Sequence, residues 1–175
     1  RGANVTLITG PTSLARPAGI KVVEVVSADD MYEACMKASE EADVMVKAAA
    51  VGDYRAASRA DQKIKRGGAR EFSLELVQNR DIAAALGRKK RPGQILVGFA
   101  AETQNVIENA QRKMTEKNLD IIVSNDVLSK GAGFAVDTNV ITILERGAEP
   151  ARFSGTKEEA ADRLLDAVAA RTAKL

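Results

Sequence analysis

Histidine and tryptophan are absent from this 175-residue chain, cysteine occurs once and aromatic residues make up only 3%. The lack of histidine removes the usual general base and the commonest zinc ligand. Any acid-base chemistry must therefore use carboxylates, lysines or the substrate itself. A single cysteine excludes an internal disulfide, and the position of Cys35 on the apolar side of an expected helix favours a structural thiol.

Long apolar runs are missing as well. No segment reaches 18 consecutive apolar residues and none resembles a secretory signal, so the sequence predicts a cytoplasmic protein that does not enter a membrane. The net charge of +2 is too small to indicate nucleic-acid binding, and few aromatic rings are available to stack on bases. With 45% hydrophobic and 29% charged residues, the composition is that of one globular domain.

Strand and helix patterns alternate along the chain and predict an open α/β sheet. Short apolar segments are the expected strands: 5–8, 20–26, 44–49, 72–77, 95–100, 119–124 and 139–144. Capping residues mark the expected helices, which begin after Ser27, Asn79, Thr103 and Thr156. Helical spacing predicts that their inward side chains are Met31, Ala34, Cys35, Ala38, Val106, Ile107, Ala110, Met114, Ala160, Ala161, Leu164, Leu165 and Val168.

The stretch from Val44 to Lys65 is the best candidate for a functional site. We interpret residues 44–49 as a central strand that ends in a polar loop, and ligands of open α/β sheets bind at such carboxyl ends. Asp53 can accept hydrogen bonds from ribose hydroxyls or help to hold a cation, while Lys63 and Lys65 can neutralise phosphate. A strand followed by a solvated loop with surface lysines explains the same spacing equally well.

A second candidate lies at the start of the expected helix 80–88. Asn79 is a good N-cap for this helix, and Asp81 in its first turn suits the helix dipole. The backbone N–H groups of residues 80–83 can also bind a phosphate. Capping alone selects the same residue types, so both interpretations stay open.

Three further features carry two interpretations each. Lys113 and Lys117 are spaced i, i+4 and form either a solvated helix face or a phosphate clamp. Phe99, near the end of its strand, is by default a core residue, and alternatively a wall for a base. The glycine-rich segment 130–134 matches no phosphate-loop pattern and is typical of a flap or an interface arm.

Six motifs appear in the order and context of one protein family: AAAVGDYR (48–55), KIKR (63–66), QNRDI (78–82), GFAAET (98–103), KNLDIIVSND (117–126) and GFAVDTN (133–139). Together they resemble bacterial phosphopantothenoylcysteine synthetase, the phosphopantothenate-cysteine ligase. This enzyme is often the second half of a bifunctional coenzyme A biosynthesis protein. The similarity covers nearly the whole chain.

The resemblance implies a Rossmann-like three-layer α/β fold with a mainly parallel sheet. Residues 1–175 would form a single nucleotide-binding ligase domain, and the protein would be a homodimer. It implies a reaction that depends on CTP and Mg²⁺. The carboxylate of 4′-phosphopantothenate attacks the α-phosphate of CTP to give an acyl-cytidylate and pyrophosphate, and the amine of L-cysteine then displaces CMP. It also implies fusion to, or assembly with, a phosphopantothenoylcysteine decarboxylase domain.

Position by position, the resemblance assigns Lys63 as the essential catalytic lysine, which stabilises the reacting phosphates or the acyl-cytidylate. Asp53 and Asp81 are candidate metal ligands. Two departures from the family pattern are Gly52, where alanine is usual, and Arg80, where proline is frequent. The residues assigned to the nucleotide site are Lys47, Ala48, Ala49, Asp53, Lys63, Arg80, Asp81, Ile82, Ala83, Phe99, Lys113 and Lys117.

The N-terminal part of the family's sequence pattern does not occur in residues 1–175. This part consists of a strand, a glycine-rich turn and an asparagine-bearing loop that contact the triphosphate, so we expect the first strand-helix unit to be missing from this chain. A polypeptide that begins at Arg1 is expected to have little or no ligase activity. Two alternatives are an NAD(P)-dependent Rossmann oxidoreductase and a non-catalytic dimerising α/β module that uses residues 131–139 and the last strand as its interface.

Overall fold

The computed structural model describes residues 1–65, 71–102, 105–126 and 138–173. Its main sheet has the order β3-β6-β7-β8-β9, in which the first three strands are parallel and the last two run antiparallel to their neighbours. Two more strands, β1 (Thr6–Thr9) and β2 (Lys21–Glu24), form a separate parallel pair. The main-sheet strands are β3 (Val44–Lys47), β6 (Ile95–Glu102), β7 (Ile121–Asp126), β8 (Thr138–Glu145) and β9 (Ala151–Thr156).

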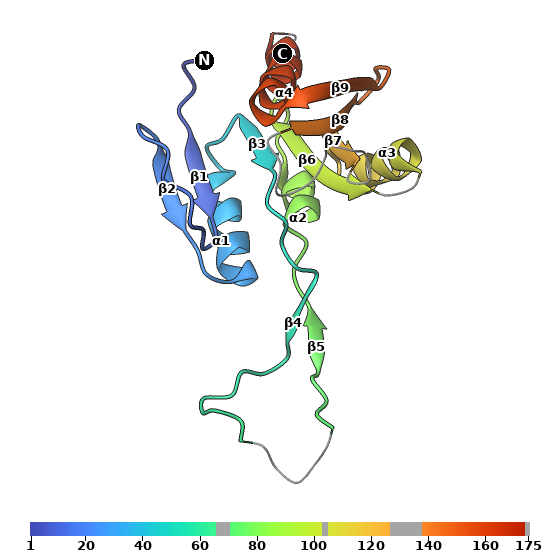
Figure 1. The fold of residues 1–175 in the computed structure, drawn as a ribbon. Helices are drawn as coiled ribbons and strands as arrows, with labels where there is room; N and C mark the ends of the chain where they lie inside the picture. Colours follow the sequence, from blue (N-terminus) through green and yellow to red (C-terminus); the bar gives the residue numbers. More distant parts are fainter. Residues whose placement is uncertain (66–70, 103–104, 127–137, 174–175) are drawn as a thin grey trace.

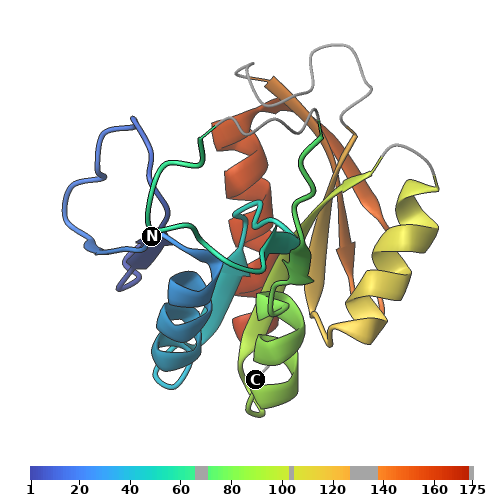
Figure 2. The same cartoon turned by 90° about the horizontal axis from the view of Figure 1, so that it is seen from below.

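Helices cover both faces of this sheet (Figure 2). One buried cluster joins α1 (Ala28–Ala38), α2 (Ile82–Lys89) and α3 (Val106–Glu116) to the sheet through side chains such as Leu86, Leu96 and Met114. The other joins α4 (Lys157–Thr172) to the opposite face, where Leu164 packs with Val97 and Ile143. The predicted three-layer α/β architecture is therefore confirmed. No helix in the described ranges is both long and apolar enough to cross a lipid bilayer.

Two helices begin where the sequence predicts, and two begin at other residues. The capping boxes at Ser27 and Thr156 are both formed. The prediction that Asn79 caps α2 is wrong: Asp81 is the N-cap and accepts a hydrogen bond from Ala84 N–H at 3.0 Å, so the helix begins at Ile82. α3 begins at Val106 with Asn105 as its N-cap. Thr103, the expected cap, lies outside the described residues.

The strand predictions need three corrections. The strand from Val44 is not central, because within the described chain it pairs only with β6 and forms an edge of the five-stranded sheet. Of the expected strand 72–77, only Leu76 and Val77 belong to a strand, β5, which extends to Gln78. The segment Ala151–Thr156 was not predicted as a strand, because Phe153 is its only large apolar residue.

The predicted inward faces of two helices are too wide. On α3, Ala110 and Met114 are buried but Ile107 is exposed. On α4, Ala160, Leu164 and Val168 are buried, whereas Ala161 and Leu165 are exposed. Each helix therefore contacts the sheet along a narrower stripe than helical spacing suggests.

A two-stranded arm leaves the body of the molecule (Figure 1). β4 (Tyr54–Ala56) pairs antiparallel with β5 (Leu76–Gln78), and the described residues next to them, 57–65 and 71–75, continue away from the sheet. Large apolar side chains are exposed along this arm: Tyr54, Ile64, Phe72, Leu74 and Leu76. The segment 130–134, expected to be a flap or an arm, lies outside the described residues.

Candidate functional site

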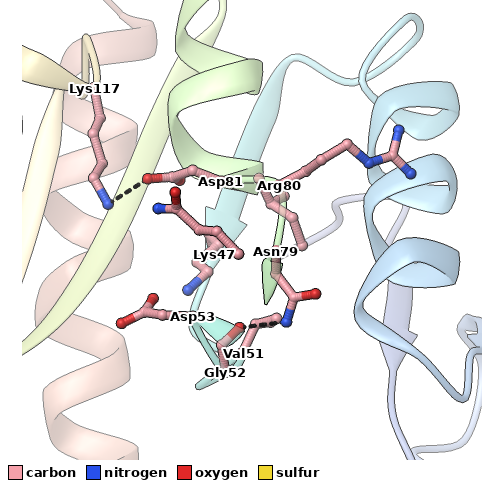
Figure 3. A pocket seen from close by; sticks show the side chains of 10 residues that line it. Lys47, Val51, Gly52, Asp53, Asn79, Arg80, Asp81 and Lys117 are labelled. Carbon is pink, nitrogen blue, oxygen red and sulfur yellow. Dashed lines mark hydrogen bonds and ion pairs between the residues drawn. The ribbon is translucent and has the colours of Figure 1, made fainter. Parts of the chain in front are cut away.

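A small polar pocket lies where β3 ends, α2 begins and α3 ends (Figure 3). Its volume is about 90 Å³. Three cationic residues and two aspartates line it, together with backbone of the chain segments that lead into and out of the arm. The lining residues are Lys47, Val51, Gly52, Asp53, Gln78, Asn79, Arg80, Asp81, Ile82 and Lys117.

Lys47, the last residue of β3, is half-buried in this pocket. Burial is the main cause that lowers the pKa of its ammonium group, and the nearby charge of Lys117 lowers the pKa further. Asp81 and Asp53 act in the opposite direction without cancelling these effects. The ammonium group of Lys47 is therefore less favourable in the pocket than in water, and an anionic ligand beside it would favour the charged form.

Asp81 and Lys117 form an ion pair across the pocket, with 2.9 Å between Lys117 Nζ and Asp81 Oδ2. Partial burial by itself would raise the pKa of Asp81. The hydrogen bond from Ala84 N–H and the ammonium of Lys117 outweigh burial, so the pKa of Asp81 is lowered. Asp81 thus stays ionised while it caps α2, and it holds Lys117 at the positive end of that helix.

Close packing of two helix ends brings Lys117 to the pocket. A Cβ atom added at Gly87 in α2 would lie 1.9 Å from the carbonyl oxygen of Lys117, so only glycine allows this approach. The next residue, Asn118, has a positive φ of 50° and donates from Nδ2 to Gly87 O at 2.9 Å. The end of α3 is therefore fixed directly against α2.

Asn79 connects the two chain segments at the base of the arm. Its backbone N–H donates to Asp53 O at 2.7 Å, and its side-chain Nδ2 donates to Gly52 O at 2.8 Å. Asn79 does not cap α2 because its side-chain amide is hydrogen-bonded to the segment that leads into the arm. The two hydrogen bonds also fix Asp53 relative to the start of the helix.

Arg80 lines the pocket but turns its guanidinium group away from it, toward α1 (Figure 3). There Nε contacts Asp29 Oδ1 at 3.1 Å and Nη1 contacts Glu33 Oε1 at 2.8 Å. The guanidinium carbon also lies 3.8 Å from the centre of the Tyr32 ring. In this geometry the side chain of Arg80 binds another element of the protein.

Of the predicted nucleotide-site residues, five besides Arg80 line the pocket: Lys47, Asp53, Asp81, Ile82 and Lys117. The others lie elsewhere. Ala48 and Ala49 are exposed just after β3, and Ala83 is buried in α2. Lys113 lies one turn before Lys117, outside the pocket lining.

Two predicted residues lie clearly apart from the pocket. Phe99 is 39% exposed, so its default interpretation as a core residue is wrong. It follows Val97 by two residues on β6, and Val97 belongs to the cluster under α4, so both side chains point to the α4 face of the sheet. Lys63 is exposed on the arm, as is Lys65.

Four pocket residues are absent from the predicted nucleotide-site residues: Val51 and Gly52, which lie within the candidate stretch 44–65, and Gln78 and Asn79. A signal was available, because Gln78 and Asn79 belong to the QNRDI motif and Gly52 to the AAAVGDYR motif. Their contribution is largely the backbone and the cross-link by Asn79. Residue type alone does not indicate such a role.

No group of three or more metal-binding side chains occurs within the part of the chain that the structure describes. The carboxylate of Asp81 already binds Lys117 and caps a helix. Asp53 lines the pocket and is exposed, so its oxygens suit a hard cation such as Mg²⁺ better than those of Asp81.

The fold and the pocket define a Rossmann-like α/β domain with a polar pocket, lined by lysines and aspartates, at the carboxyl end of a parallel strand. The chain belongs to the family described as the DNA/pantothenate metabolism flavoprotein C-terminal domain, whose model matches residues 1–172.

Named relatives support this assignment. The chain is 48% identical over 146 residues, 82% of its length, to the coenzyme A biosynthesis bifunctional protein CoaBC of Bacillus subtilis strain 168. It is 45% identical over 167 residues, 94% of its length, to a cysteine/cysteine sulfinic acid decarboxylase of an unknown prokaryotic organism. It spans 35% and 46% of the length of these two curated relatives, respectively.

A solved structure shares the fold. The crystal structure of the C-terminal domain of a coenzyme A biosynthesis bifunctional protein CoaBC resembles this chain with a TM-score of 0.78 and 36% identity. The match covers 95% of this chain and 74% of that one. The Rossmann-like α/β class predicted from the sequence is therefore confirmed.

Proposed function

We propose that this chain carries the site of a ligase that joins 4′-phosphopantothenate to L-cysteine in coenzyme A biosynthesis, with CTP as co-substrate. Its similarity to the C-terminal domain of CoaBC supports the choice of reaction. The observation that carries the proposal is the convergence of Lys47 and Lys117 at the N-terminus of α2. Two lysines beside a helix N-terminus form an anion site.

In this proposal the pocket binds only one part of CTP, because it is small. Pockets that hold a whole drug-sized ligand usually have volumes of about 300–1,000 Å³. This pocket has a volume of about 90 Å³. It therefore fits the phosphate end of the nucleotide. Lys47 and Lys117 supply the charge that the triphosphate needs, and the remainder of the nucleotide extends toward neighbouring surfaces.

The proposed chemistry suits a site without histidine. In the first step the carboxylate of 4′-phosphopantothenate, already ionised, attacks the α-phosphate of CTP and pyrophosphate leaves. In the second step the amine of L-cysteine attacks the acyl carbon of the acyl-cytidylate and displaces CMP. Both steps depend mainly on positioning and on neutralising negative charge, which Lys47, Lys117 and the exposed Lys63 of the arm can supply.

Mg²⁺ is the cation that this chemistry implies, because it neutralises the charge of the triphosphate when bound. Asp53 is the residue of this chain that would contribute an oxygen ligand, since it lies in the pocket and its carboxylate is exposed. Phosphate oxygens and waters complete such sites in many nucleotide enzymes.

We also propose that the protein is a homodimer and that the chain works beside a phosphopantothenoylcysteine decarboxylase domain. The exposed apolar side chains of the arm support a protein interface. The description of the relatives as bifunctional supports the second domain.

Titration calorimetry of the full-length protein with CTP and Mg²⁺ tests the nucleotide site. We expect binding that weakens about tenfold or more in Lys117→Met, because the variant loses a charged partner of the phosphates. Lys157→Met, which removes an exposed lysine at the start of α4, is the matched control and leaves the affinity unchanged.

The same titration separates the alternative functions. Tight binding of NAD(P)H without binding of CTP would support the oxidoreductase and contradict the ligase. Binding of neither nucleotide by a dimeric protein would support the non-catalytic module.

A further inference from the structure

The first turn of α1 meets both ends of the arm through one carboxylate. Asp29 contacts Arg80 Nε at 3.1 Å through Oδ1 and Arg55 Nη2 at 3.5 Å through Oδ2. Arg55 belongs to β4, which begins the arm, and Arg80 follows β5, which ends it. Asp29 therefore bridges two guanidinium groups that lie 25 residues apart in the sequence.

The same arginines are fixed by further contacts. Arg55 Nη1 donates to Gln78 O at 3.1 Å and to Asn79 Oδ1 at 3.0 Å. Arg80 also binds Glu33 and stacks on Tyr32, whose ring packs against the core cluster under α1 to α3. The contacts thus connect the arm base to a part of the protein that is itself packed.

Simpler explanations account for only part of this arrangement. A carboxylate in the first turn of α1 suits the helix dipole, which explains an acidic residue at position 29. It does not explain why two arginines from the arm converge on it. Asp29 and both arginines are each more than 40% exposed, so any single pair contributes little to stability. Together, these contacts therefore affect the relative positions of α1 and the two ends of the arm more than the free energy of unfolding.

The residues next to these arginines belong to the pocket. Asp53 lies two residues before Arg55, and Asp81 directly follows Arg80. A shift of either arginine therefore moves a carboxylate of the pocket, and with Asp81 it moves the partner of Lys117.

We propose that Asp29 is a positioning residue that acts through Arg55 and Arg80 to fix the two sides of the nucleotide pocket relative to each other. The proposal deepens the proposed function and rests on it for its role in CTP binding. It also assigns Arg80 to this network, in place of direct contact with the phosphates.

The test compares Asp29→Asn, Asp29→Glu, Arg80→Gln and the double variant Asp29→Asn/Arg80→Gln by titration of the full-length protein with CTP and Mg²⁺. We expect Asp29→Asn and Arg80→Gln each to weaken binding about 3- to 10-fold, and the double variant to be no weaker than either alone. Asp29→Glu restores most of the affinity. Glu41→Gln, an exposed carboxylate beyond α1, is the matched control without effect.

Direct contact between Arg80 and the phosphates gives a different result. In that case Asp29→Asn releases Arg80 for the ligand, so CTP binding is unchanged or tighter while Arg80→Gln still weakens it. Such a result would overturn the proposal.

Hydrogen exchange of the Asn79 amide supplies a readout that does not depend on CTP, because this N–H donates to Asp53 O across the base of the arm. We expect exchange to become several-fold faster in Asp29→Asn but not in Glu41→Gln. If the unsubstituted protein does not bind CTP, the proposed function fails, and unchanged exchange at Asn79 in Asp29→Asn would overturn the positioning role separately.

Discussion

Lys47 carries a positive charge that the folded protein does not fully compensate. Burial and the charge of Lys117 lower its pKa below the ordinary value of 10.5. The ammonium form is therefore less favourable in the folded state than in the unfolded chain, and folding is opposed wherever Lys47 is protonated. Such a cost is expected where a protein keeps a charge ready for a ligand of opposite sign.

Replacing Lys47 with methionine should therefore stabilise the free protein and weaken CTP binding. We expect a higher melting temperature at pH 7 and a gain of at most about 1 kcal/mol, because the side chain is only half-buried. The gain should shrink as the pH rises through the lowered pKa of Lys47 and vanish above 10.5. CTP affinity should fall about tenfold or more.

Thermal melts between pH 7 and pH 11 with parallel CTP titrations measure both effects. Lys21→Met, which removes an exposed lysine in β2, serves as the control for surface charge. A lower melting temperature in Lys47→Met together with unchanged CTP affinity would contradict this account of the pocket.

The residues of the pocket were predictable in part. The resemblance assigned Lys47, Asp53, Asp81 and Lys117 to the site, and the fold brings these four together. The direction of the Arg80 side chain was not predictable, because it depends on Asp29 and Glu33, which lie about 50 residues earlier in the chain. Phe99 could not be assigned to a face until the pairing of β6 was known.

The arm is the element that would gain most from contact with a protein partner. Its two short strands pair through Tyr54–Gln78, Arg55–Val77 and Ala56–Leu76, and one backbone hydrogen bond on either side extends this pairing. An isolated two-stranded ribbon is marginally stable in water at best, and the exposed Phe72 and Leu74 add an unfavourable apolar surface. A second copy of the chain that covers this surface would offset both costs.

Disruption of the arm surface tests the proposed homodimer. We expect Phe72→Asp to convert a dimer to a monomer, because a carboxylate buried in an apolar interface remains without a partner. Phe72 is 72% exposed, so the substitution should not unfold the domain itself. Leu14→Asp is the matched control, since Leu14 is 79% exposed outside the arm.

Light scattering coupled to size-exclusion chromatography gives the molar mass of each variant. The account predicts dimers for the unsubstituted protein and for Leu14→Asp, and a monomer for Phe72→Asp. A monomeric unsubstituted protein, or a Phe72→Asp variant that remains dimeric, would rule out this interface.

Elements with strong local signals were predicted best. The capping boxes at Ser27 and Thr156 fixed two helix starts correctly, because both partners of each box lie within four consecutive residues. β9 was missed because it is stabilised by its pairing with β8 rather than by its own composition. The antiparallel return of β8 and β9 likewise depends on tertiary pairing.

At the scale of the whole molecule, the layer order was predictable and the position of β3 was not. The alternation of strands and helices indicated helices on both faces of a mainly parallel sheet, and the structure has them. Among the described strands, β3 and β1 each keep one edge unpaired, and Val46 of β3 is 48% exposed. The expected additional strand-helix unit stays a prediction.

The proposed reaction is the ligation of 4′-phosphopantothenate to L-cysteine with CTP. The most direct measurement follows 4′-phosphopantothenoylcysteine and pyrophosphate formed by the full-length protein in the presence of Mg²⁺. The account predicts CTP-dependent product, a loss of about 100-fold or more in turnover for Lys63→Gln, and a much smaller effect for its arm neighbour Lys65→Gln. Absence of product from the unsubstituted protein, or equal activity of Lys63→Gln, would contradict it.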